Sequence, residues 1–252
     1  MCGIAGFSLL PGLIPPSEWV EGVCDVIRHR GPDSSGFVEF PGYSIGLAHT
    51  RLAIQDLSPS GHQPMSSSDG SLSIVFNGEI YNFLELRSRL EDDGYVFVGS
   101  SDTEVLLTLF KSLKRSNPQL PYSDLISLFL SGLNGIFAIA LWDHDHKSLF
   151  LARDALGVKP LYVLRSHSGI YFASEFKGLP PTPLTLNYPS LDRYLTFLWN
   201  PGESTPSSCV SKLGPGQAML IANGELQETI QWYRLPVFVL SLIHISEPTR
   251  PY

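Results

Sequence analysis

Cys2 stands directly after the first methionine, in the stretch MCGIAGF. Methionine is usually removed before a small second residue, and Cys2 would then carry a thiol and a free α-amine. An α-amine titrates near pH ~8, so it could accept the thiol proton and later protonate a leaving amine. The alternative is a small buried residue at the start of a strand, which is commoner for a second-position cysteine taken alone.

Acyl transfer from an amide to such a thiol also needs hydrogen-bond donors where negative charge develops on oxygen. Asn77 and Gly78, in the run NGE, offer a side-chain amide and a backbone N–H, and glycine lets the backbone approach closely. The alternative for this dipeptide is an ordinary Asn-Gly hairpin turn.

Two charged residues could hold the head group of an amino-acid substrate. Arg51, in the strand-like HTRLAI, could bind a carboxylate bidentately, and Asp102 could receive an α-ammonium. The alternatives are a solvated arginine on a strand and ordinary dipole compensation in the first turn of a helix. Each of these signals is ambiguous when taken alone.

Strand-like and helix-like runs are interleaved along the chain without a strict βαβ rhythm. Ser17 is expected to cap the first helix, and Ser101 with Glu104 forms a capping box before a later one. Runs of alternating or continuous apolar residues predict strands over 2–10, 37–40, 43–54, 71–76, 95–99, 135–142, 148–154, 161–166 and 170–175. Helical spacing predicts helices over 17 to about 28, from about 82, from 102 and over 124–133. The sum is an α+β layered domain with mostly antiparallel sheets.

Composition excludes several functional classes. With 24 acidic and 17 basic residues, the net charge of −7 provides no basic field for nucleic acid or an anionic membrane face. No run approaches a membrane span, and the apolar N-terminal run lacks the basic residues of a secretory signal, which predicts a cytoplasmic protein. The three cysteines are widely spaced and odd in number, as expected of reduced thiols, and no metal site is predicted.

Several sequence blocks together resemble the class II glutamine amidotransferases, and specifically the glutaminase half of asparagine synthetases. The similarity extends from residue 1 to about residue 235, and HTRLAI and FNGEIYN favour the asparagine branch over the glucosamine-phosphate branch. The blocks, in the order of that family, are MCGIAGF, RHRGPDSSG, HTRLAIQDLSPSGHQPM, FNGEIYNFLELRSRL, SDTEVLL, LNGIFAIALWD, ARDALGVKPLY and ASEFKGL.

The resemblance implies a role for each matching position. Cys2 would attack the side-chain amide of glutamine, giving a γ-glutamyl thioester and ammonia, and water would then release glutamate. Asn77 and Gly78 would form the oxyanion hole, and no cofactor is implied for glutamine hydrolysis. The residues implied to bind glutamine are Arg51, Ile54, Gln55, Glu79 and Asp102.

The implied fold is the four-layer αββα sandwich of N-terminal-nucleophile (Ntn) hydrolases, with two mostly antiparallel sheets. The domain would span residues 1–235, followed by a tail over 236–252 that lacks the family's continuation and looks artefactual or disordered. In an intact parent, ammonia would pass to an ATP-pyrophosphatase domain that uses Mg-ATP and aspartate. Neither its SGG-x-DS loop nor a Walker loop is present here, so that domain is expected to be absent. The resemblance leaves three points open: a homodimer, an acceptor other than aspartate, and a catalytically silent module.

Other reactive side chains receive structural interpretations. His29 and His49 are expected to have hydrogen-bonded structural roles, and DHDH at 143–146 is expected to be a polar hairpin tip rather than a metal site. Cys24 is expected in the core. Lys159 and the preceding Arg-Asp pair at 153–154 match the family without a mechanism and are assigned to an interface with the missing domain.

Overall fold

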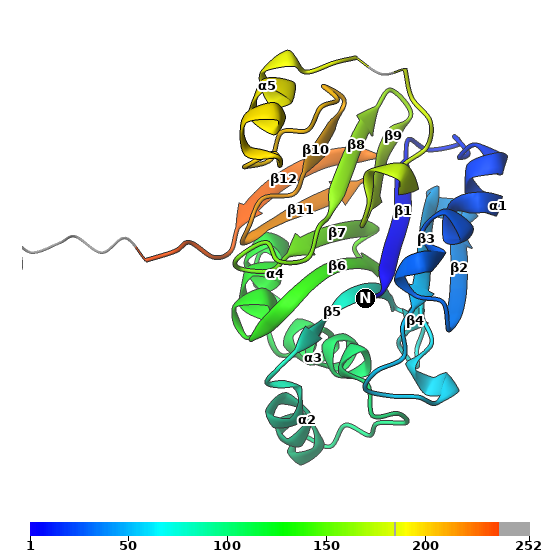
Figure 1. Cartoon of the computed structure of the whole chain (residues 1–252). Coiled ribbons are helices and arrows are strands. Elements are labelled where there is room, and N and C mark those ends of the chain that lie inside the picture. The colour runs from blue at the N-terminus through cyan, green and yellow to red at the C-terminus, as the bar shows by residue number, and fades with distance from the viewer. Residues whose placement is uncertain (184, 237–252) are drawn as a thin grey trace, which may run out of the picture.

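The computed structural model describes residues 1–183 and 185–236, and within them it contains two six-stranded, wholly antiparallel sheets (Figure 1). The predicted tail over 236–252 lies, apart from Pro236, outside the described residues. The first sheet has the order β10-β8-β9-β1-β3-β2 and consists of β1 (Gly3–Leu9), β2 (Ser34–Phe40), β3 (Ile45–Arg51), β8 (Tyr162–Ser166), β9 (Gly169–Ala173) and β10 (Val210–Lys212). The second has the order β12-β11-β7-β6-β5-β4 and consists of β4 (Met65–Ser66), β5 (Leu72–Ile80), β6 (Gly135–Asp143), β7 (Ser148–Arg153), β11 (Gln217–Ala222) and β12 (Glu225–Gln231).

Helices cover the outer faces of both sheets. In Figure 1, α1 lies beside β2 and β3, whereas α2, α3 and α4 lie against the sheet that contains β5 and β6. The five α-helices of the described residues are α1 (Ser17–Val26), α2 (Phe83–Asp92), α3 (Asp102–Ser116), α4 (Tyr122–Ser131) and α5 (Tyr188–Phe197). The predicted four-layer αββα sandwich is therefore confirmed.

Three apolar layers hold the sandwich together, and they explain why its strands read as continuous apolar runs. Along β6, Phe137, Ile139 and Leu141 pack toward the helices, whereas Ala138 and Trp142 pack toward the other sheet. Alternate side chains of a strand point to opposite faces, so a strand with both faces covered needs apolar residues at every position. The burial of these side chains is the main stabilising contribution to the fold.

Two local predictions are wrong. Ser17 is the first helical residue of α1 and makes no capping hydrogen bond, because Pro16 occupies the N-cap position. No strand forms over 95–99, where the carboxylate of Glu104 accepts the N–H groups of Val98 and Gly99 at 2.8 Å each in place of a sheet partner. Ser101 does cap α3, with its hydroxyl accepting the Glu104 N–H at 3.3 Å, so only this half of the predicted capping box forms.

Candidate active site

All eight residues predicted for the site line one pocket between the two sheets. They come from the chain start before β1, the end of β3 and the loop after it, the end of β5, and the first turn of α3. The eight are Cys2, Arg51, Ile54, Gln55, Asn77, Gly78, Glu79 and Asp102. Ile54, Gln55 and Glu79 are exposed residues of this lining.

Cys2 is fixed from both of its sides. Its Sγ lies 3.4 Å from the backbone N of Leu52 and 3.6 Å from the Leu52 carbonyl, and its own carbonyl accepts from Arg30 Nε at 3.0 Å. Gly3 permits this approach to β3, because an added Cβ there would lie 2.6 Å from Thr50 Oγ1. Met1 also lines the pocket, so the α-amine at this stage belongs to Met1.

Asn77 presents an unpaired donor to the pocket. Its side chain is only 1% exposed, and its Nδ2 has no hydrogen-bond partner within residues 1–183 and 185–236. A buried amide N–H without a partner is costly, and because Asn77 lines the pocket, this N–H is available to a ligand atom.

Gly78 directs its backbone N–H away from β6. Its partner on β6, Phe137, bonds to Asp154 on the opposite side, through its N–H to the carboxylate at 3.2 Å and through its carbonyl at 2.8 Å. Gly78 and Phe137 therefore form a non-hydrogen-bonded pair of the antiparallel ladder, and the Gly78 N–H points to the outer edge of β5. An added Cβ at Gly78 would lie 2.3 Å from the Ile136 carbonyl, so this pairing excludes larger residues.

The two N–H groups that flank the Gly78 N–H on the outer edge of β5 are both occupied. Gln63 Oε1 accepts the Phe76 N–H at 2.7 Å, and Asp102 Oδ2 accepts the Ile80 N–H at 3.2 Å. The Gly78 N–H lies between them, and no side-chain hydrogen bond of the described residues engages it. Two donors without a partner in the described part of the chain, Asn77 Nδ2 and the Gly78 N–H, therefore come from adjacent residues of the pocket. Cys2 lines the same pocket.

The two predicted head-group residues carry opposite charges. Within the described part of the chain Arg51 forms no ion pair, and its guanidinium donates to the carbonyl of Ser58 at 2.9 Å and to that of Asp56. Burial, with a smaller contribution from the charge of Glu79, raises the pKa of Asp102 to about 6. A cation at Asp102 and an anion at Arg51 would each relieve an uncompensated charge.

Lys159 also reaches the pocket, which the sequence analysis did not predict. It is 8% exposed, its Nζ lies 3.1 Å from Met1 Sδ, and burial, followed by the charge of Arg30, lowers its pKa. Its loop is held by Arg153, which donates to the Lys159 carbonyl at 2.7 Å, and by Asp154, which accepts the Lys159 N–H at 2.9 Å. Arg153 and Asp154 therefore position Lys159 in the pocket wall. In the sequence, the R-D-x₄-K spacing was the feature that could have identified this group as part of the site.

His29 and His49 have hydrogen-bonded structural roles, as predicted. His49 is buried with its Nε2 3.2 Å from the Phe76 carbonyl, and burial lowers its pKa to about 3, so it is neutral at pH 7. His29 pairs with Glu175 at 2.8 Å. Cys24, which was expected in the core, is only partly buried and packs against the apolar cluster that α1 covers.

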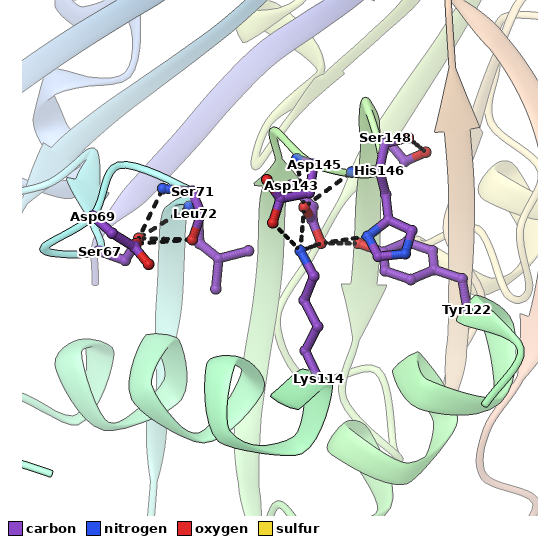
Figure 2. A network of polar contacts seen from close by, with 10 residues as sticks. All are labelled: Ser67, Asp69, Ser71, Leu72, Lys114, Tyr122, Asp143, Asp145, His146 and Ser148. Carbon is purple, nitrogen blue, oxygen red and sulfur yellow. Dashed lines mark hydrogen bonds and ion pairs between the residues drawn. The ribbon is translucent and has the colours of Figure 1, made fainter. Parts of the chain in front are cut away.

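The DHDH segment forms more than a polar hairpin tip. Asp143 is fully buried, and its carboxylate contacts Lys114 Nζ at 2.8 Å and accepts from the Tyr122 hydroxyl at 3.1 Å (Figure 2). His146 stacks on Tyr122 with ring centroids 4.1 Å apart, and its Nδ1 lies 3.1 Å from Asp143. No group of three or more metal-ligating side chains occurs in the described ranges.

Comparison with solved structures defines the class of fold first. A glutamine phosphoribosylpyrophosphate amidotransferase from B. subtilis aligns with a TM-score of 0.65 and 20% identity, covering 92% of this chain and 49% of that chain. This likeness establishes the Ntn-hydrolase fold. The profile of a glutamine amidotransferase domain matches residues 1–233, and the chain therefore belongs to the glutamine amidotransferase domain family.

The chain is also similar to individual curated proteins. Asparagine synthetase [glutamine-hydrolyzing] 1 of Bacillus subtilis is 37% identical over 88% of this chain, which corresponds to 33% of the relative. Amidase chry2 of Gibberella zeae is 32% identical over 93% of this chain and 34% of its own length. The chain thus spans about a third of these relatives. No helix in the described residues is long and apolar enough to cross a bilayer.

Proposed function

We propose that this domain hydrolyses glutamine to glutamate and ammonia through a thioester on Cys2. Loss of Met1 gives Cys2 the α-amine, which takes the thiol proton as sulfur attacks the glutamine side-chain carbonyl. The ammonium formed on Cys2 protonates the departing nitrogen, ammonia leaves, and a γ-glutamyl thioester remains. The amine then takes a proton from water as the water attacks the thioester, and this proton returns to the sulfur as glutamate is released.

The observation that carries this proposal is the pair of free donors at Asn77 Nδ2 and the Gly78 N–H, in the pocket lined by Cys2. Both would hold the oxyanion of each tetrahedral intermediate, where preorganised donors contribute most. Arg51 would bind the α-carboxylate and Asp102 the α-ammonium, with Ile54, Gln55 and Glu79 completing the glutamine pocket.

The test is glutamate release from glutamine by the chain and by its Cys2→Ser variant, with intact mass confirming that Met1 is gone. Release is expected from the processed chain and should be nearly abolished by Cys2→Ser, because the thiolate is the nucleophile. An added residue before Cys2 should have the same effect by displacing the amine. Equal release by the Cys2→Ser variant would remove Cys2 from the mechanism, and no release by a folded, processed chain would favour a silent module.

For the parent protein, we propose that the ammonia serves ATP-dependent conversion of aspartate to asparagine in a domain after residue 235. The names of the Bacillus subtilis relatives support this acceptor, and Mg-ATP and aspartate would then be ligands of that domain. A cytoplasmic location suits these substrates. Similarity to two fungal proteins named amidases, at 32% and 36% identity, supports a different acceptor as the second candidate. Amide-product analysis with the full-length parent would separate the two.

A further inference from the structure

We propose that Asp56 is a positioning residue that joins the Arg51 loop to the start of α3 and thereby sets the spacing of Arg51 and Asp102. This inference rests on the proposed function, since the spacing matters only if these two residues hold the α-carboxylate and α-ammonium of glutamine. By setting this spacing, Asp56 would favour substrates that carry both an α-carboxylate and an α-ammonium.

One side of the Asp56 carboxylate organises the loop after β3. Asp56 is 6% exposed, and its Oδ1 accepts the Ser58 N–H at 2.8 Å and the Ser58 hydroxyl at 2.6 Å. The backbone carbonyls of Asp56 and Ser58 are the groups to which the Arg51 guanidinium donates. The conformation of this turn therefore determines where the guanidinium lies.

The other side of the carboxylate reaches the segment that leads into α3. Asp56 Oδ2 accepts the Ser100 N–H at 2.8 Å, and Ser100 stands two residues before Asp102. The approach is close, because a Cβ added at Gly99 would lie 2.9 Å from Asp56 Oδ2. The carboxylate thus connects the Arg51 turn directly to the helix start that carries Asp102.

A carboxylate is required because the two oxygens accept backbone N–H groups from two different segments. An asparagine offers a single acceptor oxygen, so Asp56→Asn would satisfy either Ser58 or Ser100 and place an NH₂ group against the other N–H. The same hydrogen bonds, first from the Ser58 hydroxyl and then from Ser100, hold the pKa of Asp56 well below its usual range. Asp56 is therefore charged at neutral pH, and its hydrogen bonds are of the stronger, charge-assisted kind.

Asp56 does not contact the groups assigned to bond making and breaking. Cys2 precedes β1, and Asn77 and Gly78 belong to β5, whose register is set by β6. Loss of the Asp56 link should therefore change glutamine binding and leave the chemical step nearly intact.

The experiment compares Asp56→Asn with Asp69→Asn in the Met1-processed chain. Asp69 is a control outside the pocket, because its carboxylate likewise accepts serine hydroxyls, from Ser67 at 2.7 Å and Ser71 at 2.8 Å, and a backbone N–H, that of Ser71 at 3.2 Å. Asp56→Asn should raise KM for L-glutamine about tenfold, with kcat within about twofold, as expected for the loss of roughly one well-placed polar contact. Asp69→Asn should leave both constants unchanged.

A second substrate separates positioning from general damage. Glutaramate is glutamine without its α-amine and cannot use Asp102, so Asp56→Asn should reduce the preference for glutamine over glutaramate about tenfold. Gly99→Ala should also raise KM for L-glutamine, because the added methyl group would push the Asp56 carboxylate away from the Ser100 N–H. Every hydrogen-bonding side chain remains in this variant. This variant also keeps the test decisive if Asp56→Asn fails to fold.

Binding is measured independently of turnover as the Kd of L-glutamine for Cys2→Ala, with and without Asp56→Asn. A tenfold higher Kd supports the inference. An unchanged Kd and substrate preference in folded Asp56→Asn and Gly99→Ala would overturn it while leaving the proposed function standing. If the unsubstituted chain neither binds nor hydrolyses glutamine, the proposed function fails first and the inference falls with it.

Discussion

Asn77 can be tested as a single hydrogen-bond donor. Asn77→Ala should lower kcat for glutamine by about 10²–10³, because one of two oxyanion donors is removed from a buried site. Asn82→Ala is the matched control, since Asn82 uses its amide structurally, donating to the Gly132 carbonyl and accepting the Asn134 N–H at 3.0 Å each. Steady-state kinetics of both variants should show a kcat loss in Asn77→Ala alone, and equal losses would argue for a structural effect.

The raised pKa of Asp102 predicts how glutamine affinity depends on pH. The substrate ammonium binds the carboxylate form, so the Kd should be flat above pH 7 and should rise below about pH 6, where the free carboxylate takes up a proton. Calorimetric titration of Cys2→Ala between pH 5 and 8 measures this. His49 does not interfere, because its pKa of about 3 lies outside the range. Asp102→Asn should bind weakly with a flat profile, and a persistent break near pH 6 would exclude Asp102 as its source.

The same group should oppose folding near neutral pH. Its folded pKa, about 6, is above the ordinary value of 3.8, so its stabilising contribution is complete below pH 3.8 and is lost as the pH rises through 6. Deprotonation in the empty pocket then costs at most about 3 kcal/mol. Asp102 illustrates a binding residue whose burial is unfavourable without its ligand.

The polar network around Asp143, shown in Figure 2, connects α3 and α4 to the β6–β7 hairpin. Lys114→Met should lower the free energy of unfolding by about 3 kcal/mol, because it leaves the buried Asp143 carboxylate without its cation. Lys111→Met, in the same helix, breaks only the exposed pair with Asp69 and should cost less than about 1 kcal/mol. Urea unfolding of both variants provides the comparison, and equal losses would mean that Asp143 does not need Lys114.

Elements with strong apolar patterns were predictable, and those decided by single polar contacts were not. The β6–β7 and β8–β9 hairpins appear where alternation and turn residues placed them. The run YVFVG has the composition of a strand, yet Val96 and Val98 are each 89% exposed, and the N–H groups of Val98 and Gly99 donate to the Glu104 carboxylate instead of to a neighbouring strand. Likewise, Asp143 looked like a turn residue because its partners, Lys114 and Tyr122, lie far from it in sequence.

For the whole molecule, the sequence indicated the layers but not the order of strands within them. Hydrophobic pattern and family resemblance indicate two covered antiparallel sheets, whereas the placement of β1 between β3 and β9 depends on contacts between distant segments. All eight predicted pocket residues were placed together by resemblance, and Asp56, Gln63 and Lys159 were missed as pocket residues. Their roles depend on partners that only the folded chain brings close.

The central position of β1 also has a consequence for the order of events during synthesis. The first strand cannot complete its sheet until β9, which ends at Ala173, has left the ribosome. Throughout that interval the start of the nascent chain has no completed sheet to enter and is open to an aminopeptidase. Met1 would then be removed before the pocket exists, so the maturation of Cys2 would depend on the timing of translation rather than on access to the finished fold.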